Sequence, residues 1–193
     1  MKKLSLFTAA IVAVVLLSFK IIAPSTWTLD KGHGKLGFVI THLMVNDVEG
    51  AFTNFDATIT AINDDFTDAS VTMTADVSSV TTLNPQRDGH LKSEDFFDAA
   101  KYPTITFAST SFKKTGANTY KVIGSLTLHG VTKPVELNAT FRTGTNPMSH
   151  KTIAGCKISG ILKRSDFGIG SKFPSAMVGD EITLNANAEF VKQ

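Results

Sequence analysis

The side chains of this chain that could do chemistry are five histidines, one cysteine and a scatter of carboxylates. The densest polar group is Arg87, Asp88 and His90. These residues could form a polar gate over a cavity, or a loop that is held by its own ion pair and helix cap. His33, His42 and His90 could ligate zinc if the fold brought them together, but their spacing is not that of a zinc-ligand motif. We therefore expect no metal site.

The sequence contains none of the motifs that mark common catalytic sites. It has no Gly-rich phosphate loop, no G-x-S-x-G nucleophile motif and no H-E-x-x-H zinc motif. Cys156, the single cysteine, lies in a strand-like run from 154 to 162, so we expect a core residue that forms no intrachain disulfide. No pair of carboxylates has a spacing that indicates a general acid and base. These observations predict neither an enzyme nor a bound cofactor.

The charge balance argues against a nucleic-acid partner. The whole chain carries a net charge of +2, but three lysines and no acidic residue lie in residues 1–25. The remainder is therefore slightly acidic, with a net charge of −1. A nucleic-acid-binding protein needs a dense basic surface, and we predict no nucleic-acid binding.

Residues 1–25 have the pattern of a cleavable signal peptide. Two lysines precede an apolar stretch from 4 to 19, which is shorter than the roughly 20 residues of a membrane-spanning helix. Small residues favour cleavage after Ser25 or after Ala23. The alternative is an uncleaved anchor. We expect cleavage, with residues 26–193 forming one exported domain that is periplasmic or secreted.

Apolar and polar residues alternate with a period of two through most of this domain, as in strands with one buried face. The segment 48–61 changes phase, which predicts a bulge or bend near Asn54. Eight or nine such strands indicate a closed antiparallel barrel or a sandwich. The clearest alternating segments are residues 35–42, 71–78, 121–128, 135–142 and 181–190.

Two connections interrupt the alternation. Residues 84–101 are predicted to form a long connection with a short helix, which Asp88 could cap. Residues 164–180 are rich in glycine and irregular. An eight-stranded barrel holds either packed side chains or one small ligand. Small inward residues such as Gly50 and Gly124 fit a tunnel and a tapered solid core equally well.

Several motifs, in their order along the chain, resemble those of the YceI-like proteins. They are Trp27-Thr28-Leu29-Asp30 with Thr41-His42-Leu43, then Arg87 to Asp98, Lys101 to Phe107, Gly124 to Val135, and Lys163 to Ile169. The resemblance covers essentially the whole of residues 26–193. It implies a single eight-stranded antiparallel, lipocalin-like barrel with a long apolar tunnel and no enzymatic activity. YceI-like proteins are bacterial, mostly periplasmic, and bind polyisoprenoids and related amphiphiles.

The resemblance implies that this chain carries or sequesters a long apolar amphiphile, such as a polyisoprenoid, an isoprenoid quinone or a polyprenyl phosphate. We expect transient contact with a membrane during ligand exchange, and we leave a homodimer open. Two alternatives remain. One is an enzyme that uses Arg87, His90 and His42 in the barrel pocket, and the other is a stress-response interaction module with a solid core.

Strand phase and the resemblance together predict the residues that contact the ligand. The predicted tunnel walls are Phe38, Ile40, Phe52, Phe107, Leu126, Leu128, Ile158 and Phe167. Arg87 and His90, with His42 and Arg164, are predicted to hold the connection over one tunnel end and to meet the ligand head. Phe96 and Phe97 form a short apolar segment beside them.

Overall fold

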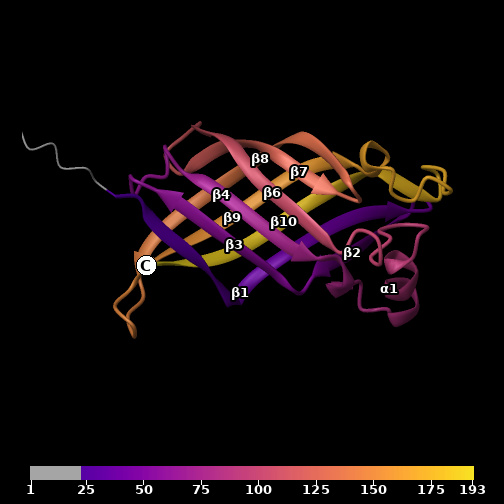
Figure 1. Cartoon of the computed structure of the whole chain (residues 1–193), viewed down its shortest axis with the longest axis horizontal. Helices are drawn as coiled ribbons and strands as arrows, with labels where there is room; N and C mark the ends of the chain where they lie inside the picture. The colour runs from indigo at the N-terminus through magenta and orange to yellow at the C-terminus, as the bar shows by residue number, and fades with distance from the viewer. Residues whose placement is uncertain (1–22) are drawn as a thin grey trace, which may run out of the picture.

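A computed structural model describes residues 23–193, and most of the expected signal peptide lies outside them. The described chain is almost entirely β-structure, as Figure 1 shows. Its helices are α1 (Pro85–Lys92) and two short 3-10 turns, η1 (Val77–Ser79) and η2 (Arg164–Phe167). Within this part of the chain no helix has the length and hydropathy of a membrane-spanning segment. The strands are β1 (Ser25–His42), β2 (Asn46–Phe52), β3 (Phe55–Ala61), β4 (Ser70–Asp76), β5 (Val80–Thr81), β6 (Thr104–Lys114), β7 (Thr119–Leu128), β8 (Val131–Thr145), β9 (Thr152–Lys163) and β10 (Val178–Lys192).

The sheet closes into a barrel between its first and last strands. β1 pairs antiparallel with β10, with Phe38 opposite Leu184. The first part of β1 also pairs with β3 and its last part with β2, so β2 and β3 share one position in the barrel. Among residues 23–193 the order is therefore β1, β2/β3, β4, β6, β7, β8, β9 and β10. This is the predicted eight-stranded antiparallel barrel, and it excludes the sandwich.

The break between β2 and β3 is the bend that the change of phase predicted. Phe52 at the end of β2 and Ala57 in β3 are both buried. In an uninterrupted strand these two positions would point to opposite faces. The bend at residues 53–54 therefore keeps the apolar side chains of both segments inside.

The long connection carries the predicted short helix, but a different residue caps it. The Asn84 side chain accepts a hydrogen bond from the Arg87 amide at 3.1 Å, and Pro85 is the first helical residue. Asp88 lies inside α1, so our prediction that it caps the helix was wrong. Its carboxylate instead accepts hydrogen bonds from the amide and hydroxyl of Thr82, at 2.7 and 2.6 Å. The helix begins earlier than expected because Asn84 and Pro85 supply a cap and a first turn.

Aromatic side chains fill the end of the barrel opposite α1. Trp27 and Phe66 are almost fully buried, with ring centroids 5.2 Å apart, and Phe66 stacks on Phe141 at 4.6 Å. Tyr120 packs edge-on against Phe141, and its hydroxyl donates a hydrogen bond to the Asp65 carbonyl oxygen at 2.6 Å. This end is therefore a packed core in which the Tyr120 hydroxyl is satisfied, whereas the buried indole N–H of Trp27 has no hydrogen-bond partner within residues 23–193.

Two inward glycines make room for aromatic rings. A Cβ at Gly50 would collide with the Phe38 ring, and a Cβ at Gly124 would collide with the Phe107 ring. The small residues at these two positions therefore do not open a tunnel by themselves, because neighbouring strands fill the space.

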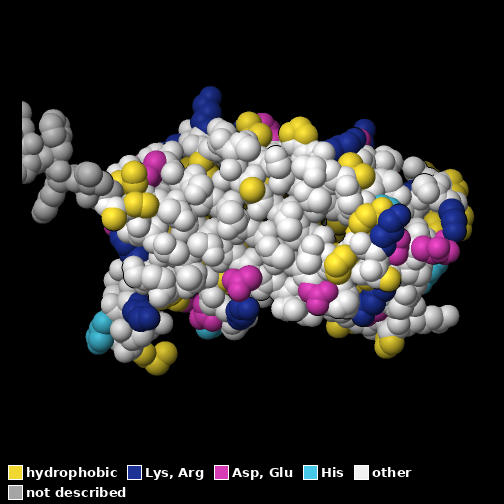
Figure 2. All heavy atoms as spheres, viewed as in Figure 1, with side chains coloured by type: hydrophobic (Ala, Val, Ile, Leu, Met, Phe, Trp, Pro, Cys, Tyr) yellow, Lys and Arg dark blue, Asp and Glu magenta, His cyan; other side chains and the backbone are white. Residues whose placement is uncertain are grey.

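The outer surface of the barrel is polar and of mixed charge. Acidic and basic side chains are interspersed on the face in Figure 2. Some of them pair across neighbouring strands, as Lys121 of β7 does with Glu136 of β8 at 2.6 Å. The polar faces of the strands thus point to solvent, as their alternation predicted.

Candidate binding cavity

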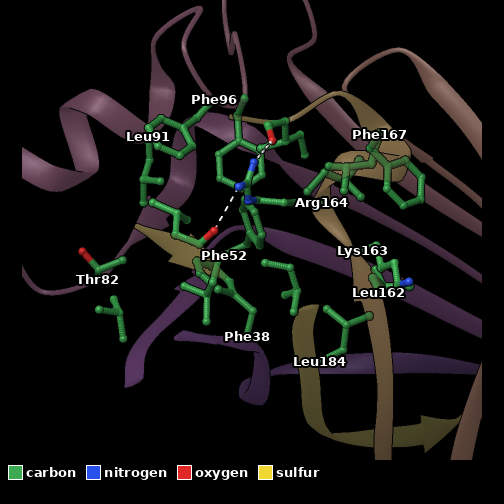
Figure 3. Close-up of a pocket in the computed structure, with 18 of the residues that line it drawn as sticks. Phe38, Phe52, Thr82, Leu91, Phe96, Leu162, Lys163, Arg164, Phe167 and Leu184 are labelled. Atoms are coloured by element: carbon green, nitrogen blue, oxygen red, sulfur yellow. Dashed lines mark hydrogen bonds between the residues drawn. The ribbon is translucent and has the colours of Figure 1, made fainter. Parts of the chain in front are cut away.

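A cavity of about 320 Å³ occupies the half of the barrel next to α1. Its walls are mainly apolar side chains from the strands, and residues of α1 and the loops beside it surround its outer end. Figure 3 shows Phe38, Phe52, Leu162 and Leu184 lining the space, with Phe96 and Arg164 above it. Exposed residues, among them His42 and Met177, also border the space. The cavity is therefore open to solvent at this end.

Most of the predicted site residues border this cavity. Those in its walls are Phe38, Ile40, Phe52, Leu126, Leu128 and Phe167. Those nearer its opening are His42, Arg87, His90, Phe96, Phe97 and Arg164. The fold thus gathers side chains from β1, β2, β7, α1 and η2 around one space.

Phe107 and Ile158 lie outside the lining, contrary to our expectation. Phe107 is buried and lies opposite Leu126, which lines the cavity. Its ring, however, leans over Gly124, which is farther from the opening than Leu126. Ile158 of β9 is opposite Ala186, which lies deeper than the lining residue Leu184. Both residues therefore belong to the core beneath the cavity.

Several lining residues were not among the predicted ones. Strand alternation could have predicted six of them, because they have the inward phase of their strands. They are Leu36, Met73, Ile105, Leu162, Ile182 and Leu184. The residues from helix and loop segments have no such period and could not be found in this way; they are Leu91, Ile169, Phe173 and Met177.

Arg164 borders the cavity, but its guanidinium is fully engaged by the loop that follows η2 and by the start of β10. The residue is only 6% exposed. An arginine side chain has five N–H donors, and here each has a backbone acceptor at 2.6–3.0 Å. No donor is therefore left for a ligand head unless the loop opens. The acceptors are the carbonyl oxygens of Ile169, Gly170, Phe173, Val178 and Gly179.

Arg87 has donors to spare. Its Nε donates to the Thr82 hydroxyl at 2.7 Å and its Nη2 to the Thr82 carbonyl oxygen at 3.0 Å. Within residues 23–193 its Nη1 group has no hydrogen-bond partner. Arg87 therefore supports the turn before α1 and retains N–H groups at the cavity opening.

The sequence and the barrel fold match known proteins. A family model described as the YceI-like domain matches residues 27–190. The chain belongs to the YceI-like family. A UPF0312 protein of Staphylococcus aureus strain MSSA476 is 34% identical over 171 residues, which cover 86% of this chain and 97% of that protein. The match therefore spans almost all of the described barrel.

Solved structures of YceI-like and related proteins have the same fold. A Campylobacter jejuni YceI protein is 31% identical with a TM-score of 0.72, and covers 79% of this chain and 90% of its own. Burkholderia cenocepacia BcnA is 27% identical with a TM-score of 0.73, and the match covers 83% of this chain and 98% of BcnA. A polyisoprenoid binding domain from Saccharophagus degradans shares the fold at 16% identity, with a TM-score of 0.65. This match covers 86% of this chain and 98% of that domain.

In this YceI-like barrel, contacts between two connections close part of the opening. The Phe96 ring, from the connection after α1, stacks on Phe173, from the loop after η2, at a centroid distance of 4.9 Å. Asp95 accepts hydrogen bonds from Lys172 at 2.5 Å and from His90 at 3.2 Å. The hydrogen bonds from Lys172 and then His90 lower the pKa of Asp95, which keeps it charged. We call these five residues the gate contacts.

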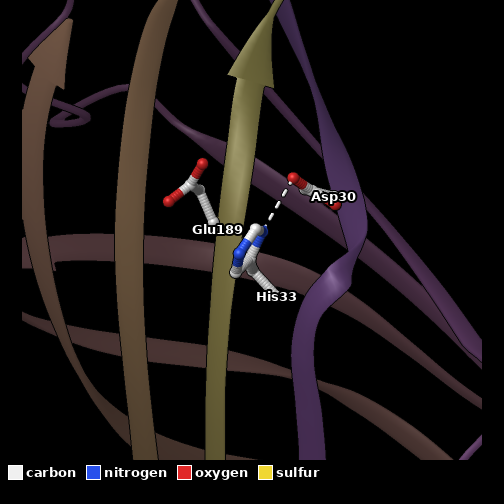
Figure 4. A group of neighbouring side chains, drawn as sticks. All are labelled: Asp30, His33 and Glu189. Atoms are coloured by element: carbon white, nitrogen blue, oxygen red, sulfur yellow. Dashed lines mark hydrogen bonds and ion pairs between the residues drawn. The ribbon is translucent and has the colours of Figure 1, made fainter. Parts of the chain in front are cut away.

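The histidines considered as zinc ligands lie in two places. His42 and His90 border the cavity, whereas His33 lies on the outer wall beside Asp30 and Glu189, as Figure 4 shows. His33 Nδ1 is 3.0 Å from Asp30 Oδ2. The hydrogen bond to Asp30, and then the negative charges of Asp30 and Glu189, raise the pKa of His33. The fold therefore does not bring His33 together with the other two.

Cys156 of this YceI-like chain is a core residue, as predicted. It is 8% exposed and lies opposite Phe141 of β8 and Ala188 of β10. Burial raises the pKa of its thiol to about 12. The thiol is therefore protonated at neutral pH and is a poor nucleophile.

Proposed function

We propose that this YceI-like protein binds a long apolar amphiphile of the polyisoprenoid class and carries or sequesters it. The observation that carries this proposal is the division within the cavity. Apolar side chains form its walls, whereas the charged and titratable side chains are confined to its outer end. Such a site fits a molecule with an apolar tail and a polar head. The Saccharophagus degradans domain with this fold, described as polyisoprenoid binding, adds support.

Desolvation of the tail supplies the binding energy in this proposal. Each buried CH₂ group contributes about 0.8 kcal/mol, so a tail of several isoprene units binds without polar contacts. Arg87 is the residue that we propose for the head group, because its remaining N–H groups lie at the opening. A phosphate head would gain a charge-assisted hydrogen bond there, and a quinone head would gain a neutral one.

We propose binding rather than catalysis. Two of the polar side chains at the cavity are already occupied, Arg164 by backbone carbonyl oxygens and His90 by Asp95. Cys156 is not at the cavity and its thiol is protonated at neutral pH. The alternative of a solid-core interaction module is disfavoured by the cavity itself.

We also propose that the signal-peptide pattern of residues 1–25 exports the chain to the periplasm or beyond, where the barrel meets its ligand. N-terminal sequencing of the protein from the periplasmic fraction tests this. A start near Thr26 supports export with cleavage, whereas an intact Met1 in the membrane pellet contradicts it.

Mass spectrometry of lipid extracted from the purified protein tests the ligand class. We expect an isoprenoid in the wild type and its loss in Leu126→Trp, because the larger side chain fills the cavity. The matched control is Ser125→Trp, since the neighbouring residue points outward on the same strand. If both variants retain the same lipid as the wild type, the cavity is not the binding site.

A further inference from the structure

Exposed apolar side chains lie on three segments at the cavity end of the barrel: the β1–β2 turn, the residues before α1 and the loop before β10. Nine large apolar side chains in residues 23–193 are exposed, and five of these belong to segments at this end of the barrel. Figure 2 shows apolar side chains at the α1 end of the barrel, among charges of both signs. We call the five residues the apolar rim; they are Leu43, Met44, Val45, Leu83 and Met177.

The rim is continuous with the cavity. The Leu43 amide donates a hydrogen bond to the Met177 carbonyl oxygen at 2.9 Å, and Met177 itself lines the cavity. Leu83 directly follows Thr82, another lining residue. An apolar molecule leaving the cavity would therefore pass rim side chains before it reached open water.

The backbone of the rim is unusual for such residues. Leu43, Met44 and Leu83 have φ angles of 52°, 60° and 60°. Asn and Gly adopt this left-handed conformation at least cost, and bulky side chains rarely do. Packing does not explain why bulky apolar residues occupy these positions, because Met44 is 74% exposed and Leu83 94% exposed. Strained and exposed apolar residues at one place indicate a function outside the fold itself.

We propose that the apolar rim inserts into the surface of a lipid bilayer, so that the ligand passes directly between bilayer and cavity. This inference rests on the proposed function. A bilayer is favoured over a protein partner because the ligand class resides in membranes, and transfer through the rim keeps its tail out of water. A few apolar side chains on a turn give shallow, reversible insertion, which suits repeated loading and release.

Flotation with phosphatidylcholine vesicles that contain no isoprenoid tests the rim separately from the cavity. We expect the ligand-free wild-type protein to float with the vesicles and Leu43→Asn/Met44→Gly to remain behind. This variant keeps the turn, because Asn and Gly adopt its conformation more easily than Leu and Met. The control is Met148→Asn, an 87% exposed apolar residue in the β8–β9 turn at the opposite end. The control should float like the wild type.

Transfer of a polyisoprenoid from vesicles to protein provides the second measurement. The rim variant should load at least about tenfold more slowly, as expected when two apolar contacts with lipid are lost. Its equilibrium affinity for the same ligand added from solvent should be unchanged. The rim proposal is overturned if the wild type fails to float. It is also overturned if the rim variant floats and takes up the ligand as the wild type does. Failure of the solvent-added ligand to bind the wild type would instead overturn the proposed function.

Discussion

Arg164 is a buried cation whose contacts are all to backbone. Its five hydrogen bonds join the start of η2 to the loop that follows η2 and to the first two residues of β10. Such a residue cannot be replaced by another cation without loss, because the five acceptors match the fork of a guanidinium. Removing it leaves several buried carbonyl oxygens without donors.

Arg164→Lys should therefore lower the free energy of unfolding by at least about 1–3 kcal/mol, the cost of leaving a buried carbonyl oxygen without a donor. Urea denaturation followed by circular dichroism measures this loss. Arg142→Lys, at an exposed position on β8, should change it by less than about 0.5 kcal/mol. Equal stabilities for the two variants would show that the Arg164 contacts do not hold the loop.

Arg87 is expected to act on the head group of the ligand. Arg87→Ala should weaken a polyprenyl phosphate about tenfold or more, as befits a hydrogen bond to a charged group, and a quinone with the same tail by much less. Titrations of both ligands at two salt concentrations measure the difference. Equal losses that do not depend on salt would mean that Arg87 only supports the turn through Thr82.

His33 should give a pH-dependent contribution to stability. Its pKa is raised by Asp30, so the pair stabilises the fold below the ordinary histidine pKa of 6.5 and loses that contribution as the pH rises through the raised pKa. The pKa of Asp30 is lowered by His33, so the Asp30 contribution is present above 3.8 and is lost as the pH falls through the lowered pKa. The window of stabilisation therefore lies between 3.8 and 6.5.

His33→Asn should thus destabilise the protein more at pH 5.5 than at pH 9. Chemical denaturation at the two pH values provides the comparison, and NMR titration of the histidine ring checks the raised pKa. The effect will be small because both groups are exposed. A variant that loses equal stability at both pH values would contradict an ionic contribution.

At the scale of elements, we expect the two connections over the opening to decide how fast a ligand exchanges. Their ion pair joins a half-buried Asp95 to an exposed Lys172, so water screens it and it contributes little to global stability. It does join segments far apart in the sequence at the place where a tail must pass. We therefore expect opening to separate the gate contacts, including the Phe96–Phe173 stack.

Asp95→Asn should raise the rates of ligand binding and release together by a few-fold, with little change in affinity. The reason is that it weakens the closed state without altering the cavity walls, and an exposed pair is worth up to about 1 kcal/mol. Stopped-flow exchange of a fluorescent isoprenoid measures the rates. Glu136→Gln, which breaks a similar exposed pair on the outer wall, should leave them unchanged. Slower exchange in Asp95→Asn would contradict a gate.

The strands were more predictable than the connections for a physical reason. A strand repeats its environment every second residue, so Phe38 and Ile40 could be assigned to the interior from the sequence alone. The loop after η2 has no period, and its shape depends on one side chain, Arg164, bonding to five scattered carbonyl oxygens. Backbone acceptors leave no trace in residue types, so neither these contacts nor Phe173 could be anticipated.

At the scale of the whole molecule, the barrel divides into a filled half and a hollow half. Sequence alternation established that residues point inward but did not show which half they fill. Phe107 illustrates the difficulty, because its ring direction depends on Gly124 of a neighbouring strand. The depth of a cavity is therefore a property of packing between strands rather than of any one strand.

The first strand of the barrel starts in the filled half, and the last strand ends there. β1 begins and β10 ends there, and the Gln193 amide donates a hydrogen bond to the Thr26 carbonyl oxygen at 2.9 Å. Figure 1 shows this end opposite α1. A tether attached ahead of Ser25 would consequently hold the closed pole of the barrel toward the bilayer and turn the open pole away. If the leader is cleaved as we propose, cleavage would do more than release the protein, because it would free the barrel to turn its open end toward the lipid from which we propose that it loads.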